Sequence, residues 1–286
     1  MSQRLLVTGC EGFVGSRAVL HFKEKGWAVT GIDLAIHREI PGVTKIPLDL
    51  RDPQALRSLE GADFEYVIHA AADQTSKTIL ANNAAADGNL IACLSRKRNV
   101  KGAIFMSSSL VSTSADIQYT RSKILAENRL CESGLPYVVL RPDMIYCRDE
   151  KKMTEYAGMI QKGFAVVVGS GAYLRSPTHL DDILAVFELV LNDNRFTNKV
   201  YEVGSPEPLS MDDIVKTLAQ VLGKKVRLIH LPLPVAKFLF SLRGGLDVEQ
   251  LTTMELDRVS DLQRLRQDFD YTPRTFPQGV ESFKKA

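Results

Sequence analysis

A glycine-rich turn near the start of the chain is the feature that most constrains the fold. Thr8-Gly-Cys-Glu-Gly-Phe-Val-Gly15 follows a strand-like run over residues 4–8. It opens a helix pattern, because Val14, Ala18 and Phe22 recur at the spacing of one helix face. A glycine triplet alone is a weak signal, since glycines mark turns in general. The order strand, turn, helix is the context that a dinucleotide-binding motif requires, and it is present here.

Each glycine of this turn has an expected task. Gly9 permits the tight turn, Gly12 lets the backbone approach a pyrophosphate, and Gly15 allows close contact between helix and strand. The pyrophosphate would then lie on the N–H groups that open the helix. The candidate cofactor-binding residues at this turn are therefore Gly9, Glu11, Gly12, Phe13, Val14 and Gly15.

Short apolar runs alternate with helix patterns along the first half of the chain. We expect further strands at residues 28–33, 43–50, 66–71, 102–107 and 137–141, with helical stretches at 53–59, 76–98 and 117–133. Such alternation implies right-handed crossovers and a parallel, doubly wound sheet. We therefore predict an α/β fold, with a Rossmann domain over residues 1–142, to which C-terminal segments can return, and a smaller α+β substrate lobe over residues 143–286. In that lobe we expect strands at 165–169, 200–204 and 226–230 and a helix at 211–222.

Two carboxylates at strand ends are candidates for holding the nucleotide. Asp33 ends the second strand and can accept hydrogen bonds from both ribose hydroxyls; it would repel a 2′-phosphate, which favours NAD(H). His37 and Arg38 follow closely and keep NADP(H) open as an alternative. Asp49 closes the third strand, where it can accept from the adenine amino group and the backbone of Leu50 can contribute. The alternative interpretation is that Asp49 only helps to start the next helix.

A tyrosine and a lysine four residues apart form the candidate catalytic pair. Tyr119 and Lys123 share one face of a helix. A tyrosine hydroxyl is a poor base at neutral pH, but a nearby ammonium and a cationic nicotinamide favour the phenolate. Tyr119 can then exchange a proton with a substrate hydroxyl or carbonyl during hydride transfer, and Lys123 can also hold the nicotinamide ribose. The run Ser107-Ser-Ser109 ends the fifth strand, where a serine can stabilise a developing alkoxide.

Together these motifs resemble the extended short-chain dehydrogenase/reductase superfamily, in its NAD-dependent epimerase/dehydratase group, along nearly the whole chain. The matching segments are the glycine turn, Asp49, His69-Ala-Ala-Ala72, Asn83 with Asn89-Leu-Ile91, Arg141-Pro142, residues 169–175, His179-Leu-Asp-Asp182 and residues 265–273. The resemblance implies further cofactor-binding residues, namely Ala70, Ala71, Ala72, Asn83, Tyr119, Lys123 and Pro142. It also implies a homodimer built on the helices that follow the fourth and fifth strands.

Departures from the family pattern narrow the chemistry. When the chain is aligned on Val111, Ser108 takes the place of the catalytic hydroxyl, and Ser109 is next in line as a catalytic and substrate-binding candidate. Dehydratases of this family carry Asp-Glu directly after that hydroxyl and some epimerases carry Cys, whereas this chain has Ser109-Leu110. The resemblance therefore implies plain hydride transfer at a secondary alcohol or ketone, by an NAD(P)-dependent oxidoreductase or 4-epimerase.

Two segments point to different substrates. Arg175 matches an arginine that grips the diphosphate in family members that act on nucleotide sugars, and a surface ion pair is the alternative. The stretches 231–235 and 238–240 resemble a lipid-facing pocket wall, which favours an alicyclic or lipid-like ketone, although an apolar stretch is more often core. The sequence leaves both substrate classes open.

Composition excludes several other classes of function. The formal net charge is +2 and the longest basic run, Arg96-Lys-Arg98, is short, so no nucleic-acid partner is expected. The four cysteines have no paired spacing, and His179 and His230 have no ligand spacing, so no metal site is expected. Free thiols suit a reducing compartment, and neither a signal peptide nor a membrane-spanning apolar run is evident. We expect a cytoplasmic protein without membrane insertion that acts on a small molecule.

Two other hypotheses compete with an enzyme. The first is a catalytically silent member of the same fold that uses NAD(P)H as a structural or sensing ligand, against which the intact Tyr119 and Lys123 argue. The second is a protein that binds no nucleotide at all. Titration with NADH separates this last hypothesis from the others, because it predicts no change in fluorescence.

Overall fold

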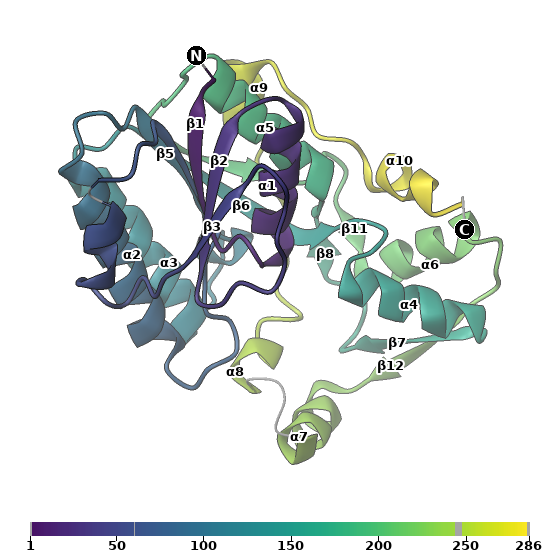
Figure 1. Ribbon diagram of the computed structural model, residues 1–286. Helices are drawn as coiled ribbons and strands as arrows, with labels where there is room; N and C mark the ends of the chain where they lie inside the picture. Colours follow the sequence, from purple (N-terminus) through teal and green to yellow (C-terminus); the bar gives the residue numbers. More distant parts are fainter. Residues whose placement is uncertain (1, 60, 244–247, 285–286) are drawn as a thin grey trace. The chain divides into compact units, whose positions relative to one another are not determined.

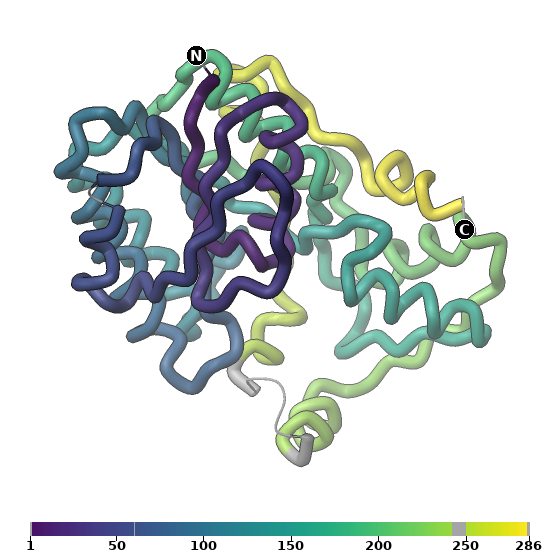
Figure 2. The backbone as a smooth tube through the Cα atoms, viewed as in Figure 1, coloured from purple at the N-terminus to yellow at the C-terminus, as the bar shows by residue number. Residues whose placement is uncertain are grey.

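The computed structural model describes residues 2–59, 61–243 and 248–284. The chain divides into two compact units, each assembled from segments that are far apart in the sequence. Unit 1 comprises Met1–Ser108, Gln118–Leu140 and Leu184–Tyr201, and unit 2 comprises Ser109–Ile117, Arg141–Ile183 and Glu202–Ala286. Figure 2 traces the chain through these segments by residue number.

A largely parallel sheet forms the middle of unit 1. Its strands are β1 (Arg4–Thr8), β2 (Ala28–Asp33), β3 (Thr44–Pro47), β4 (Tyr66–His69), β5 (Gly102–Met106) and the first parts of β6 (Tyr137–Tyr146) and β10 (Lys199–Val203). The strand order is β10-β6-β5-β4-β1-β2-β3, and all neighbouring strands from β6 to β3 are parallel. The order reverses at β1, which pairs with β2 on one side and with β4 on the other. In doubly wound sheets, ligands bind beyond the carboxyl ends of the strands at such a reversal.

Helices cover both faces of this sheet (Figure 1). α2 (Ile79–Ser95) and α3 (Gln118–Glu132) lie side by side on one face, and α1 (Phe13–Glu24) lies on the other with the second part of α5 (Leu180–Asn192). A short 3-10 helix, Ala55–Leu59, follows β3. The predicted fold class, an α/β protein with a doubly wound parallel sheet, is confirmed.

Burial in unit 1 explains why its central strands are apolar throughout. Every residue of β4 and β5 is buried, since helices pack on both sides of them. Leu90 and Leu94 of α2 and Leu130 of α3 are fully buried against the same sheet. Each such leucine contributes about 1.5–3 kcal/mol to the free energy of unfolding. The central strands therefore hold their carboxyl ends in fixed positions, where the candidate site lies.

Unit 2 is an α+β lobe with short strands. β7 (Phe164–Val168) runs parallel to β12 (Arg227–Leu231), β8 (Leu174–Arg175) runs antiparallel to β11 (Leu209–Ser210), and β9 (Pro177–His179) runs parallel to the second part of β6. The helices are α4 (Lys151–Gln161), α6 (Met211–Val221), α7 (Leu233–Arg243), α8 (Val248–Leu251), α9 (Gln263–Phe269) and α10 (Phe276–Val280), with 3-10 turns at Ser109–Ser112 and Glu281–Lys284. The elements predicted at 165–169, 200–204, 211–222 and 226–230 lie within one residue of β7, β10, α6 and β12.

Aromatic packing and capping fix the lobe. The buried ring of Tyr146 packs against the rings of His179 and Phe276, with centroids 5.1 and 5.0 Å away. Ser210 caps the start of α6, and its hydroxyl accepts a hydrogen bond from the backbone N–H of Asp213. Within the described residues, no helix is long and apolar enough to cross a membrane.

Candidate active site

The glycine turn has the backbone geometry that its sequence predicts. Gly9 has a φ of +69°, which favours glycine, and a Cβ atom there would lie 2.7 Å from the backbone nitrogen of Ala71. A Cβ on Gly15 would lie 2.1 Å from the carbonyl oxygen of Gly9. The turn is therefore a cradle that side chains would fill. Gly12 is exposed and serves as the N-cap of α1.

The start of α1 fits the pyrophosphate of a dinucleotide. No side chain caps this helix end, so its first N–H groups point outward at the carboxyl end of β1. The positive end of the helix dipole adds to the attraction for an anion. Phe13 and Val14 are partly exposed residues of this first turn, as the prediction requires.

Asp33 braces the turn and is flanked by a second carboxylate. Its Oδ2 accepts from the backbone N–H of Glu11 at 2.9 Å, and its Oδ1 accepts from that of Leu34 at 2.8 Å. The carboxylate of Glu11 lies 2.5 Å from Nζ of Lys45, an ion pair whose lysine side chain is 5% exposed. The hydrogen bond from Lys45 lowers the pKa of Glu11. The carboxylates of Asp33 and Glu11 thus lie together at the end of β2, and a carboxylate in this place disfavours a 2′-phosphate.

Lys45 is a residue that the sequence interpretation missed. It lies on β3, 34 positions after Glu11, and its Nζ also donates to the carbonyl oxygen of Arg38 at 2.8 Å. A lone lysine in a strand gives no pattern to recognise. Lys45 comes near Glu11 because β3 pairs with β2, which ends at Asp33, and this pairing is known only from the folded sheet.

Asp49 is engaged by a neighbouring arginine. The guanidinium of Arg51 donates to both of its oxygens, at 2.7 to 3.1 Å, and lowers the pKa of this carboxyl. β3 ends at Pro47 and not at residue 50, because the backbone turns back with the N–H of Asp52 donating to the carbonyl of Asp49. Leu50 is buried, and its carbonyl accepts from the side chain of Asn89 at 3.1 Å. An adenine contact of Asp49 stays a prediction.

The alanine motif after β4 is held against the glycine turn. The N–H of Ala70 donates to the carbonyl of Thr8 at 3.2 Å, and that of Ala71 donates to the Thr8 hydroxyl at 3.3 Å. The same hydroxyl contacts His69 Nδ1 at 2.7 Å, and His69 Nε2 contacts Asp87 at 2.8 Å. All three side chains are at most 2% exposed, so they position the motif from within. Ala72, in contrast, is exposed.

Asn83 lies beneath this loop. Its Oδ1 accepts from the N–H of Asp73 at 2.7 Å, and its Nδ2 donates to the carbonyl of Asp73 and to the hydroxyl of Ser122. The side chain is 2% exposed. Asn83 thus ties the segment after the alanine motif to α3, and a direct contact with the cofactor stays a prediction.

Tyr119 and Lys123 lie one helical turn apart on α3, as the spacing predicts. Nζ of Lys123 is buried, donates to the carbonyl of Met106 at 2.9 Å, and lies 5.8 Å from the centroid of the Tyr119 ring. Met106 ends β5, so this bond fixes the ammonium at the carboxyl end of that strand. Ser107 donates to Glu127 of α3 at 2.5 Å. Ser108, the catalytic candidate, follows in the same unit.

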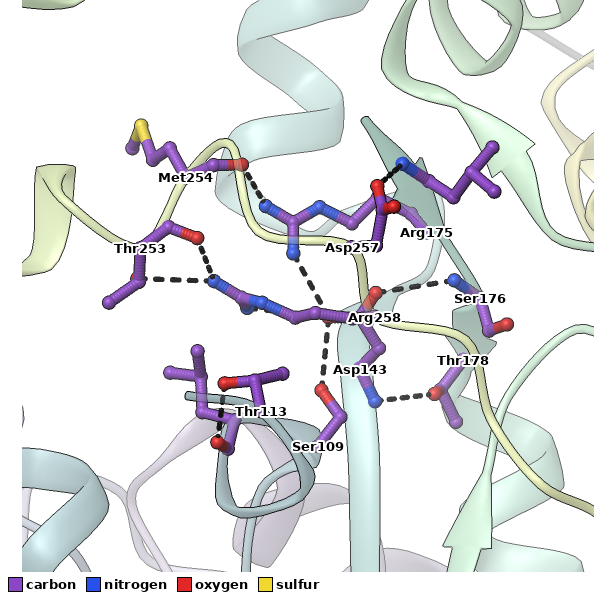
Figure 3. Close-up of polar contacts among 12 residues, drawn as sticks. Ser109, Thr113, Asp143, Arg175, Ser176, Thr178, Thr253, Met254, Asp257 and Arg258 are labelled. Carbon is purple, nitrogen blue, oxygen red and sulfur yellow. Dashed lines mark hydrogen bonds and ion pairs between the residues drawn. The ribbon is translucent and has the colours of Figure 1, made fainter. Parts of the chain in front are cut away.

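A second polar cluster lies in unit 2 around Asp143 (Figure 3). This carboxylate is 2% exposed. The hydroxyl of Ser109 donates to its Oδ1 and the N–H of Ser176 donates to its Oδ2, each at 3.3 Å. The guanidinium groups of Arg258 and Arg175 lie 3.4 and 3.8 Å from Oδ1. Two arginines therefore lie at one buried carboxylate, and Asp257 belongs to the same cluster, where its Oδ1 accepts from the backbone N–H of Leu174 at 2.7 Å.

Arg175 is held from several sides. It is 6% exposed, its Nη2 donates to the carbonyl of Met254 at 2.5 Å, and its guanidinium lies 5.0 Å from the centroid of the Tyr173 ring. Its Nη1 makes no hydrogen bond to the part of the chain that the structure describes. Arg175 is therefore not in a surface ion pair. A buried guanidinium with an unused donor suits an anionic group such as a phosphate.

The sequence interpretation did not single out Asp143 or Arg258. Asp143 directly follows Pro142, a cofactor-binding candidate that is buried in β6 of unit 2. Asp143 and Arg258 are 115 positions apart, and only the folded lobe brings them together. Among the described residues, no group of His, Cys, Asp and Glu could hold a metal ion.

The fold and the glycine turn define a dinucleotide-binding Rossmann protein with a second α+β unit. Comparison with family models matches residues 5–204 to the NAD dependent epimerase/dehydratase family. The chain belongs to this family, which confirms the resemblance seen in the sequence. The family is NAD-dependent, so NAD is confirmed as the cofactor.

Individual relatives agree with this assignment. The chain is 28% identical over 260 residues to the N-acetyl-alpha-D-glucosaminyl-diphospho-ditrans,octacis-undecaprenol 4-epimerase of Escherichia coli O157:H7, covering 82% of this chain and 77% of the relative. Its fold is similar to UDP-glucose 4-epimerase of Thermotoga maritima, solved with UDP-glucose, at a TM-score of 0.79, 18% identity and coverage of 99% and 98%. It is also similar to WbmG of Bordetella bronchiseptica, solved with NAD and UDP, at a TM-score of 0.79, 19% identity and coverage of 99% and 94%.

Proposed function

We propose that this protein is an NAD-dependent 4-epimerase that acts on a sugar carried on a diphosphate. The observation that carries the proposal is the arrangement of Tyr119 and Lys123, with the lysine ammonium buried and fixed at the carboxyl end of β5. A phenol beside a fixed ammonium can release and regain a proton at a substrate hydroxyl. Ser108 is the candidate to hydrogen-bond the oxygen that loses this proton.

The cofactor would be held by this chain's own groups. The N–H groups at the start of α1 would hold the pyrophosphate, Asp33 the ribose hydroxyls, and Lys123 the nicotinamide ribose. Bound NAD supplies a two-electron acceptor that returns the electrons, so that a secondary alcohol is oxidised and reduced again without net redox change. Net oxidation or reduction of a secondary alcohol would use the same hydride transfer once, without the return step.

Two groups of observations support a diphosphate-linked sugar. The buried guanidinium of Arg175 has one nitrogen, Nη1, that makes no hydrogen bond to the described residues, so it can donate to an anion. The Escherichia coli relative acts on a sugar linked through a diphosphate to undecaprenol, and the Thermotoga maritima structure contains UDP-glucose. Ser109-Leu110, where dehydratases of the family carry Asp-Glu, argues against elimination. The alternative substrate, an alicyclic or lipid-like ketone, carries no phosphate for Arg175 to bind, so this residue does not support it.

The test is turnover of sugar diphosphates by the purified protein. UDP-glucose, UDP-N-acetylglucosamine and a prenyl-diphosphate-linked N-acetylglucosamine are incubated with the enzyme and NAD, and the configuration at C4 is followed by NMR. Tyr119→Phe should lower the rate at least about 100-fold and leave NADH binding, followed by fluorescence, unchanged. Tyr156→Phe, a matched removal of a hydroxyl on α4, should keep full activity.

A second candidate is a catalytically silent protein of the same fold. It predicts NADH binding without turnover of any of these sugars, and equal behaviour of the wild type and Tyr119→Phe. We also propose a homodimer formed through α2 and α3, as the resemblance implies. Sedimentation velocity measures this directly, and a monomer at micromolar concentration would contradict it.

A further inference from the structure

Helix α7 presents an apolar face that the described residues of unit 2 leave largely exposed. Val235, Phe238 and Leu239 are 44%, 64% and 46% exposed. Their spacing of three and four residues places them on one side of the helix. Ala236, which directly follows Val235, is fully buried and anchors the helix. The sequence left two interpretations of this stretch open, a lipid-facing wall and core, and these three side chains are not part of the core.

The chain around this helix is mainly basic. Residues 223–251 contain Lys224, Lys225, Arg227, Lys237 and Arg243 against Asp247 and Glu249, although the whole chain has 36 basic and 34 acidic residues. Lys224, Lys225 and Arg227 are exposed. They precede or lie on β12, the strand that leads directly into α7 (Figure 1). The segment therefore joins an apolar helix face to a strand whose start carries exposed basic side chains.

This combination selects one kind of partner. Exposed apolar faces of this kind are uncommon in soluble proteins and mark contact surfaces. A second copy of the same face would bring two sets of positive charges together, which disfavours self-association. An anionic lipid surface satisfies both features, because its acyl boundary accepts apolar side chains and its phosphates attract lysine and arginine.

We propose that α7 docks on an anionic lipid bilayer. In this arrangement Val235, Phe238 and Leu239 enter the boundary between headgroups and acyl chains, while Lys224, Lys225 and Arg227 contact lipid phosphates. The helix lies on the membrane and does not cross it. The inference needs neither cofactor nor catalysis, and it goes beyond the proposed function. It would bring the enzyme to substrates whose diphosphate is anchored in a membrane.

The experiment is flotation of the full chain with vesicles, in the absence of NAD and sugar. Vesicles of phosphatidylcholine alone are compared with vesicles that also contain phosphatidylglycerol. The wild type should float with the anionic vesicles, and added salt should weaken binding. The double substitution Phe238→Ser and Leu239→Ser should lower the affinity by about tenfold or more. Lys224→Glu with Lys225→Glu should lower it as well.

Controls separate the alternatives. Leu34→Ser removes an exposed leucine of unit 1, 62% exposed, and should leave vesicle binding unchanged. Retained NADH binding by each α7 variant shows that the protein is folded. The proposal is overturned if the wild type ignores anionic vesicles, or if both double variants bind them as tightly as the wild type. It is also overturned if the serine variant changes only the sedimentation coefficient, since the face would then join two chains. If the wild type floats with anionic vesicles but shows no epimerase activity, only the proposed function is contradicted.

Discussion

A Cβ atom on Gly15 would lie 2.1 Å from the carbonyl oxygen of Gly9, well inside van der Waals contact. The first turn of α1 therefore packs directly on the turn that follows β1. Because the obstructing atom is backbone, it cannot rotate away as a flexible side chain would. The two glycines together set the position of the N–H groups that would hold the pyrophosphate.

Gly15→Ala should therefore displace the start of α1 and weaken NADH binding by about tenfold or more, because the misplaced N–H groups lose hydrogen bonds to the anion. Isothermal titration measures this. Gly158→Ala is a matched control, since a Cβ at Gly158, inside α4, meets nothing within 4 Å. That change should leave NADH binding intact and raise the free energy of unfolding by about 0.5–1 kcal/mol. Equal NADH affinity of Gly15→Ala and wild type would contradict the tight-packing argument.

Asp33 should set the preference for NAD over NADP. Replacing it with serine removes one of two carboxylates beside the turn and leaves Glu11 paired with Lys45. We expect the ratio of NADPH to NADH dissociation constants to fall by about tenfold. Fluorescence titration of both nucleotides gives this ratio. If both affinities fall equally, Asp33 only braces the backbone of Glu11 and Leu34.

Asp143→Asn should destabilise the protein, because it removes the buried carboxylate beside the buried guanidinium of Arg175 and the partly buried guanidinium of Arg258. We expect a loss of about 3 kcal/mol in the free energy of unfolding, measured in urea. Asp193→Asn removes a carboxylate whose ion pair with Arg195 is 46% exposed on each side, and should change stability by less than about 0.5 kcal/mol. A small effect at Asp143 would mean that the arginines repel each other less than their positions indicate.

Cys10 should be unreactive at neutral pH although it lies in the cofactor turn. Burial raises the pKa of its thiol to about 11, and the nearby carboxylates of Asp33 and Glu11 add to this while Lys45 opposes it. A thiol reagent at pH 8 should modify the exposed Cys131 and leave Cys10 untouched, as peptide mass spectrometry would show. The pKa is raised in the folded state only. The contribution of the protonated thiol to the free energy of unfolding is therefore present below about pH 8.5 and is lost as the pH rises toward 11. Modification of Cys10 at the rate of Cys131 would show that the turn opens in solution.

The sequence predicts the fold and those parts of the candidate site that depend on local patterns. The glycine turn, the Tyr119–Lys123 spacing and the central strands are encoded within a few residues each. The pairing of Glu11 with Lys45, and of Asp143 with Arg258, is not, because it depends on strand order and on the folded lobe. Arg274 is a further example. Its Nε donates to Asp182 at 3.0 Å, and the hydroxyl of Tyr271 donates to the same carboxylate at 2.8 Å, joining two motifs whose contact the sequence could not predict.

Hydrophobicity alone also could not place α7. Phe238 and Ala236 belong to one apolar stretch, yet one is exposed and the other is buried. The difference depends on which neighbouring elements pack on the helix, and that information is distributed over the whole unit.

Three elements, β6, α5 and β10, begin in one unit and end in the other. No single cut of the polypeptide can therefore release either unit complete. A fragment that ends anywhere between residues 141 and 183 lacks the strand β10, which completes the sheet of unit 1. Limited proteolysis should accordingly yield nicked but associated protein, and gene fusions at internal sites would have to respect both units at once. A fragment that contains unit 1 and nothing else can be made only by joining three separate pieces of the chain.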